Sequence, residues 1–171
     1  MHDIPLMIQT ESSNCVQTAA SQYLSFYGIN VSPEKIQQKV PIRQDHKGNP
    51  FGTFMQDIAS WMTQELHLRP ALHVFDIEII DRKWKNLPVT ELIAQLESFK
   101  KDGNHSFLGT ELSTSVVGSY IDFLKLGGKV EIEICTRQMI KDLLKKGPII
   151  AVLNYNYLYS TPRVSYNKVD R

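Results

Sequence analysis

The segment from Cys15 to Gly28 constrains the fold most strongly, because its apolar residues recur with the period of a helix. The residues expected to face inward are Val16, Ala19, Ala20, Tyr23, Leu24 and Tyr27. Side chains able to cap the start of such a helix precede it at Ser12, Ser13 and Asn14. Gly28 suits the left-handed conformation that often ends a helix. We therefore predict a helix over residues 15–27 with one face packed in a core.

The rest of the chain alternates between predicted helices and strands. Helices are expected over residues 32–39, 53–66, 89–101, 115–126 and 136–146. Strands are expected over residues 4–8, 71–80, 129–134 and 148–153, the last one buried on both faces. In the last helix, the residues expected to face inward are Met139, Ile140, Leu143 and Leu144. A chain of 171 residues, 42% of them apolar, fits one α+β domain over residues 1–171.

Composition argues against several classes of function. The 19 basic and 18 acidic side chains give a net charge of +1, which argues against a dedicated nucleic-acid binder and gives no reason to expect an anionic membrane as partner. No apolar stretch approaches the length of a membrane span, and the N-terminus lacks the pattern of a signal peptide. The two cysteines form no zinc-binding pair, so neither a metal nor another cofactor is expected. We predict a cytoplasmic protein.

The residue most able to carry chemistry is Cys15, at the start of the first predicted helix. A cysteine is often only a small buried side chain. Here, however, the free N–H groups and the dipole of a helix N-terminus favour a thiolate, and the preceding turn is polar enough to face a cleft. Gln9 stands six residues earlier, at the end of the predicted strand 4–8. Its amide could donate a hydrogen bond beside the thiol, as an oxyanion hole requires.

The N-terminal part of the chain has the pattern IPLMIQ, then five further residues and Cys15, then the small pair Ala19-Ala20 and the ending Tyr27-Gly28. This combination resembles the opening of the C39-like cysteine peptidases. These peptidases are a branch of the papain-like superfamily. The resemblance implies that Cys15 is the nucleophile at the head of the central helix and that Gln9 supplies the oxyanion hole. The family usually has glycine after its cysteine, where this chain has valine.

A second resemblance lies at residues 145–159, KKGPIIAVLNYNYLY, which is similar to the helix, Gly-Pro turn and strand that lead toward the family's catalytic histidine. Together the two matches imply a papain-like fold, with N-terminal helices packed on an antiparallel sheet. The family places histidine and then aspartate or asparagine after that strand. This chain has no histidine after Pro148, and Asp170 lacks a preceding one. We therefore expect a C-terminally truncated domain with an incomplete sheet, whose base and orienting residue lie beyond Arg171.

The five histidines all come earlier, at His2, His46, His67, His73 and His105. His46 and His105 are expected in loops, where either could approach a cleft, although a solvated loop histidine is the simpler interpretation. The tyrosines of the C-terminal part, Tyr155, Tyr157, Tyr159 and Tyr166, could line a substrate groove or could simply pack. The glycines at residues 48–53 lack the lysine of a phosphate-binding loop.

Several functions remain open on the sequence alone. The first is a cysteine peptidase or amidase acting on a peptide or amide substrate through an acyl-enzyme. Transfer of the acyl group to an amine is a close variant, because the intermediate is shared. A non-catalytic module could instead bind a peptide in the same cleft. Finally, Cys15 could be purely structural in an unrelated fold.

Overall fold

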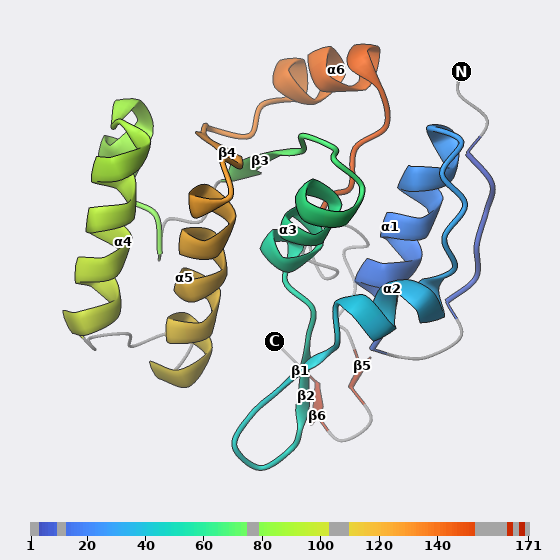
Figure 1. The fold of residues 1–171 in the computed structure, drawn as a ribbon, viewed down its shortest axis with the longest axis horizontal. Coiled ribbons are helices and arrows are strands. Elements are labelled where there is room, and N and C mark those ends of the chain that lie inside the picture. Colours follow the sequence, from blue (N-terminus) through green and yellow to red (C-terminus); the bar gives the residue numbers. More distant parts are fainter. Residues whose placement is uncertain are drawn as a thin grey trace.

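The computed structural model describes residues 4–9, 13–74, 79–102 and 110–152, and the backbone of two short strands at Val164–Ser165 and Lys168–Val169. The described elements are α+β, as expected, with helices making up most of the body (Figure 1). Within these ranges no helix is both long and apolar enough to cross a lipid bilayer. The predictions for His2, His105, Asp170, and all four C-terminal tyrosines lie outside the described residues.

The elements follow one another along the chain in this order: α1 (Cys15–Phe26), α2 (Pro33–Lys39), β1 (Arg43–Gln44), β2 (Pro50–Gly52), α3 (Met55–Glu65), β3 (Ala71–Val74), the 3-10 helix η1 (Arg82–Asn86), α4 (Val89–Asp102), α5 (Thr110–Lys125), β4 (Lys129–Ile132), α6 (Arg137–Lys146), β5 (Val164–Ser165) and β6 (Lys168–Val169). All six predicted helices are present. The largest error in their bounds is at the start of α5, which begins five residues earlier than expected.

Strand pairing differs from the expectation. β3 and β4 pair in parallel, with Ala71 opposite Lys129 and Val74 opposite Ile132. They are joined through η1, α4 and α5, a crossover of the length that parallel strands require. Antiparallel pairing is limited to the short pairs β1–β2 and β5–β6. The prediction of N-terminal helices packed on an antiparallel sheet is therefore not met among the described residues.

Two hydrophobic clusters form the interior. One lies between β3, β4, α4 and α5, and its most enclosed residues include Leu96 and Val117. The other joins α1, α2 and α3 through residues such as Leu24, Ile36 and Ile58. Figure 1 shows α4 and α5, which contribute to the first cluster, on one side of α3, and α1 and α2, which contribute to the second, on the other side.

The buried face of α1 is more polar than the apolar pattern predicted. Three of its buried side chains are polar, namely Gln17, Thr18 and Ser21. Thr18 Oγ1 donates to Asn14 O at 3.0 Å, and the Oε1 of Gln17 is buried without a partner among the described residues. Gln17 Nε2 donates to Val40 O at 3.1 Å and Thr53 Oγ1 at 2.7 Å, and Ser21 Oγ donates to Val31 O at 2.6 Å. These bonds tie α1 to both neighbouring helices, whereas Tyr27, which was expected to face inward, is 47% exposed.

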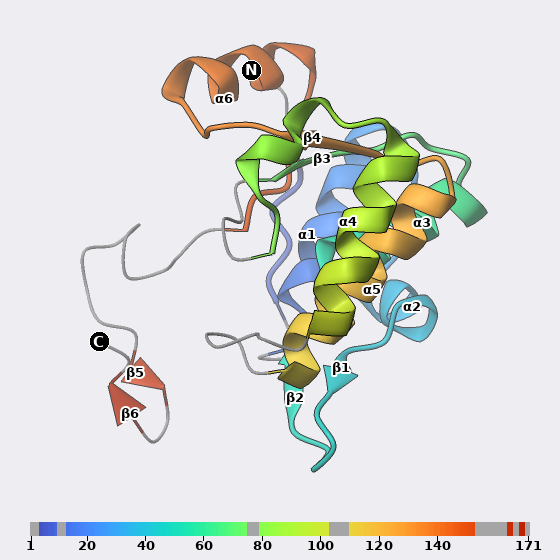
Figure 2. The same cartoon turned by 90° about the vertical axis from the view of Figure 1, so that its left-hand side faces the viewer.

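The prediction for α6 is correct in its bounds, and its inward face is covered only in part. Thr136 caps the helix, since its hydroxyl accepts from Met139 N at 3.1 Å. None of the residues of α6 is fully buried, although Met139, Ile140 and Leu143 are partly buried, and none belongs to either hydrophobic cluster of the described chain. Figures 1 and 2 show α6 at one edge of the molecule, outside the group of helices formed by α1, α3, α4 and α5.

Candidate functional site

Cys15 is the first residue of α1, and its thiol is free and exposed. Asn14 is the N-cap residue, although its side chain makes no capping hydrogen bond. The first helical bond runs from Thr18 N to Asn14 O at 3.0 Å, so the three preceding amides have no acceptor within the helix. Those amides and the helix dipole favour negative charge at this end of α1. The free amides and the helix dipole would both stabilise a thiolate on Cys15 or an oxyanion formed on it.

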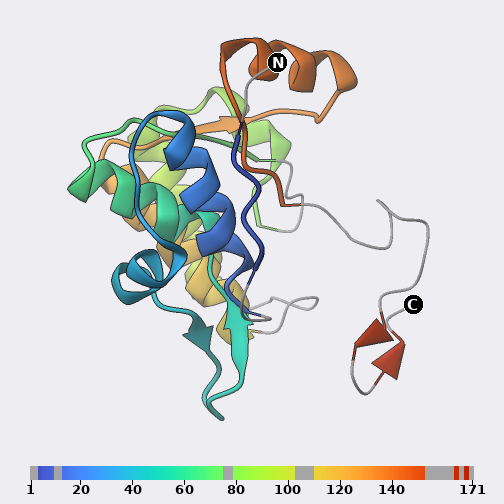
Figure 3. The ribbon, with the colours of Figure 1, turned by 90° about the vertical axis from the view of Figure 1, so that its right-hand side faces the viewer.

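Gln9 ends an extended segment, residues 4–9, which runs beside α1 in the opposite direction (Figures 1 and 3). The segment is attached to the helix by Gln22, whose Nε2 donates to Pro5 O at 3.1 Å. It forms no strand ladder with the described residues, so the predicted strand 4–8 is extended but unpaired. Because the segment and α1 are antiparallel, Gln9 closes the segment at the end of α1 that begins with Cys15. Residues 10–12, which connect the two, lie outside the described ranges.

A second extended segment, residues 147–152, also lies against α1. Ile150 packs on the cluster that contains Leu24. At Gly147, the hydroxyl of Tyr27 stands 2.8 Å from the position that a Cβ would take, so α1 touches the backbone there. The predicted strand 148–153 is not paired among the described residues. Burial of both its faces is wrong as well, because Val152 is 76% exposed.

The three described histidines lie on other parts of the molecule. His46 is in the loop between β1 and β2, where its Nδ1 is 2.8 Å from Glu111 Oε2, and this hydrogen bond raises the pKa of His46. His73 lies on β3, with Nδ1 4.0 Å from Glu133. His67 is exposed after α3 and has a positive φ of 53°. No hydrogen bond or ion pair joins any of these three residues to Cys15.

The most connected polar group of the described chain is one that the sequence did not single out. Arg43 donates from Nε and Nη2 to the two carboxylate oxygens of Asp57, at 2.7 and 2.8 Å, and this bidentate bond raises the pKa of Arg43. Nη2 also donates to Ser119 Oγ at 2.8 Å, and the guanidinium lies 4.9 Å from the ring centre of Phe54. Arg43 thereby connects β1, α3 and α5. The only sequence signal is a charge directly after the apolar run VPI.

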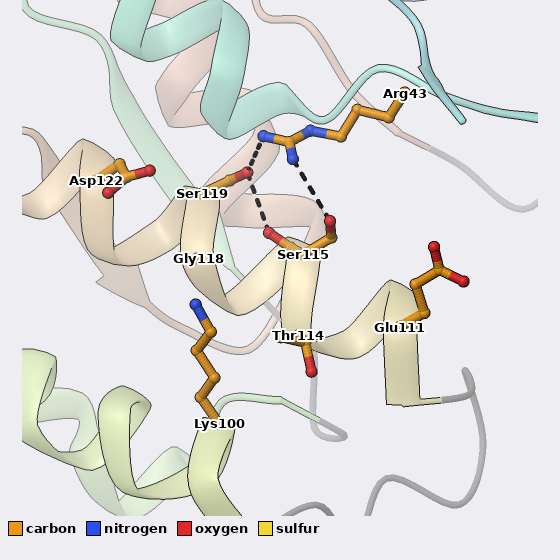
Figure 4. Close-up of a pocket in the computed structure, with 8 residues that line it drawn as sticks. All are labelled: Arg43, Lys100, Glu111, Thr114, Ser115, Gly118, Ser119 and Asp122. Carbon is orange, nitrogen blue, oxygen red and sulfur yellow. Dashed lines mark hydrogen bonds between the residues drawn. The ribbon is translucent and has the colours of Figure 1, made fainter. Parts of the chain in front are cut away.

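Two open hollows flank this arginine. Figure 4 shows the first, of about 620 Å³, in which Arg43, Ser115 and Ser119 form one wall and Lys100 reaches toward Gly118. The second, of about 700 Å³, lies between the end of α2, α3 and α5. Neither Cys15 nor Gln9 lines either hollow. Cys15 is exposed and lies outside both of these hollows.

The described residues contain no cluster of histidine, cysteine, aspartate and glutamate that could hold a metal ion. Comparisons with models of protein families, with curated proteins and with solved structures find no match to this chain. The geometry around α1 is therefore the basis on which a function can be proposed.

Proposed function

We propose that the chain is a cysteine peptidase-like hydrolase of the C39-like group, in which Cys15 attacks an amide carbonyl and Gln9 donates to the oxyanion. In this proposal residues 1–171 belong to one papain-like domain, and α1 is its central helix. The amide C–N bond breaks and the amine leaves as the acyl-enzyme forms on Cys15, and water then takes the acyl group from the sulfur. Transfer to an amine would use the same intermediate and the same two residues.

One observation carries the proposal: the free, exposed thiol of Cys15 stands at the start of α1, and the antiparallel segment 4–9 brings its last residue, Gln9, to that same end. Two further features agree with it. Segment 147–152 lies against α1, where a papain-like sheet would begin. The exposed apolar residues of both extended segments, which include Leu6 at 88% and Val152 at 76%, are the kind that further strands would cover.

The absence of a histidine at Cys15 among the described residues favours a second candidate, a module of the same fold that binds a peptide without cutting it. A thiol without a base is a weak amide hydrolase near neutral pH, because the base deprotonates and orients it. The two candidates differ in one measurable property. Only the hydrolase needs Cys15 to accept an acyl group with help from Gln9.

The test uses 4-nitrophenyl acetate, an activated ester that a thiol attacks without a general base. We expect the intact mass of the chain to rise by one acetyl group, and peptide mapping to place that group on Cys15. Gln9→Ala should slow acetylation by about tenfold; removing one donor from a complete oxyanion hole costs about 10²- to 10³-fold. Gln38→Ala, at an exposed glutamine of α2, is the matched control and should leave the rate unchanged.

The chain also provides a control for the nucleophile, because Cys135 is a second free and exposed thiol. Cys135→Ala should leave the fast acetylation intact, whereas Cys15→Ala should abolish it. Equal acetylation of the two cysteines, or an unchanged rate in Gln9→Ala, would contradict the hydrolase proposal and leave the binding module as the better candidate.

A further inference from the structure

The helix α6 has an apolar face that the molecule covers only in part. Its four apolar residues, Met139, Ile140, Leu143 and Leu144, are spaced so that they fall on one arc of about 140° when each residue turns the helix by about 100°. Leu144 is 47% exposed, whereas the other three are partly buried. The chain before the helix is also apolar and open to solvent, with Ile134 62% exposed.

The charges of α6 are arranged around this arc. Arg137 borders one edge of it and Lys146 borders the other, while Lys141 and Lys145 lie on the opposite side of the helix. The only acidic residue of the helix is Asp142, whose carboxylate accepts from Lys145 Nζ at 2.7 Å. The three remaining cations have no carboxylate within ion-pair distance in the described chain.

The near-neutral charge of the whole chain hides the concentration of basic residues on α6. With four basic residues and one acidic residue, α6 carries +3. The chain as a whole has 19 basic and 18 acidic side chains, so the remainder has 15 and 17 and carries −2. A basic face on a helix at the edge of the molecule (Figure 2) is complementary to an anionic surface, and the rest of the protein does not neutralise it.

We propose that α6 docks the protein on an anionic lipid surface, with its apolar arc at the boundary between headgroups and acyl chains. Cations at both edges of the arc can reach headgroup phosphates while the apolar residues are buried between them. The exposed apolar residues extend from Leu144 of α6 to Ile134 in the segment before it, which suits a broad surface better than the narrow groove of a partner protein. This docking is independent of the chemistry proposed for Cys15.

The experiment is sedimentation of the full chain with vesicles of phosphatidylcholine alone or with phosphatidylglycerol added. We expect binding to the anionic vesicles only, and loss of that binding as salt is raised from about 0.05 to 0.5 M. Arg137→Glu with Lys146→Glu should weaken binding by about a hundredfold or more, because each basic residue near such a surface contributes about a fivefold factor and each substitution reverses a charge rather than only removing it. Leu144→Asn should weaken it by about three- to tenfold.

Lys83→Glu with Lys85→Glu reverses the same number of charges on the exposed helix η1 and is the matched control. Vesicle binding of this variant should stay close to that of the original chain. Circular dichroism of each variant checks that the fold is kept. Absence of binding to anionic vesicles at low salt would overturn the proposal and favour an acidic protein partner. Equal binding to both vesicle types, or an equal loss in the η1 variant, would also overturn it.

Discussion

The helices α1 and α6 show how differently two amphipathic segments can be used in one chain. α6 has the more regular apolar pattern of the two, yet it buries none of its residues. α1 has a less regular pattern and buries Leu24 completely, together with the polar Gln17 and Ser21. The difference lies in the neighbours, because α1 packs against α2 and α3 while α6 lies at the edge of the described molecule. Periodicity predicts a face, and neighbouring elements decide whether it is covered.

The largest expected difference between the helices concerns a pair of leucines. Leu24→Ala on α1 should lower the free energy of unfolding by about 2–5 kcal/mol, because it removes a fully enclosed side chain and leaves a cavity. Leu144→Ala on α6 should change it by less than about 0.5 kcal/mol, since Leu144 is 47% exposed. Urea unfolding followed by circular dichroism measures both. Similar losses would show that α6 is packed in solution.

Two glutamines give the next comparison. Gln17→Ala should cost about 1–3 kcal/mol, because Val40 O loses its donor in a buried position. Gln138→Ala on α6 removes only an exposed bond to Asp142 one turn away, and should cost less than about 0.5 kcal/mol. The same unfolding experiment applies. If Gln17→Ala lowers the free energy of unfolding as little as Gln138→Ala does, α1 is held in place by its apolar residues alone.

A substitution at Gly147 tests the contact between the end of α6 and Tyr27 of α1. Gly147→Ala places a methyl group 2.8 Å from the Tyr27 hydroxyl and also strains the backbone, whose φ there is 158°, so it should cost about 2 kcal/mol. Tyr27→Phe removes that hydroxyl, so the double variant should recover the steric part of the loss and keep the part due to backbone strain. If Gly147→Ala is equally destabilising in both backgrounds, the contact between segment 147–152 and α1 is not formed in solution.

The smallest expected effects concern pH. Burial, followed by the hydrogen bond to Tyr27, raises the pKa of Tyr23 on α1 to about 12. Since the unfolded chain ionises near pH 10, stability should be unaffected below that pH and fall between about 10 and 12, by about 1 kcal/mol because Tyr23 is only half buried. Tyr23→Phe should remove this dependence when unfolding is followed from about pH 9 to about pH 12.

The corresponding carboxylate on α6 is Asp142, whose pKa is lowered first by the hydrogen bond from Lys145. A lowered carboxylate pKa adds stability above the unfolded value, and that stability is lost as the pH falls through the folded value. Because Asp142 is fully exposed, Asp142→Asn should leave the acid limb of the unfolding profile unchanged. A clear shift in that limb would show that α6 is integrated more tightly than its exposure indicates.

The sequence predicts the helices well, because caps such as Ser32 and Thr136 and the stop at Gly28, with φ of 76°, act locally. It fails where the outcome depends on distant partners. The parallel pairing of β3 with β4 depends on a crossover through two helices, and the burial of Gln17 depends on a backbone carbonyl at Val40. Arg43 was missed for the same reason, since Asp57 and Ser119 meet it only in the folded chain.

For the candidate site, the structure describes the local part of the prediction, which is the position and exposure of Cys15. Cys15 begins its helix and is exposed, which follows from the polar turn before it and the apolar pattern after it. A base for Cys15 is a long-range feature that no local pattern can supply, and none of the three described histidines is bonded to it. Its function as a nucleophile therefore stays a prediction.

The most direct measurement of that prediction uses the two exposed cysteines as each other's reference. Cys15 lies within the first turn of α1, whereas Cys135 lies just before the N-cap of α6, outside the helix. Alkylation by limiting iodoacetamide, followed by peptide mass spectrometry, gives both rates in one sample. We predict that Cys15 reacts about two- to fivefold faster near neutral pH, the factor expected from a helix N-terminus alone. Equal rates, or a faster Cys135, would contradict the assignment of Cys15 as the nucleophile.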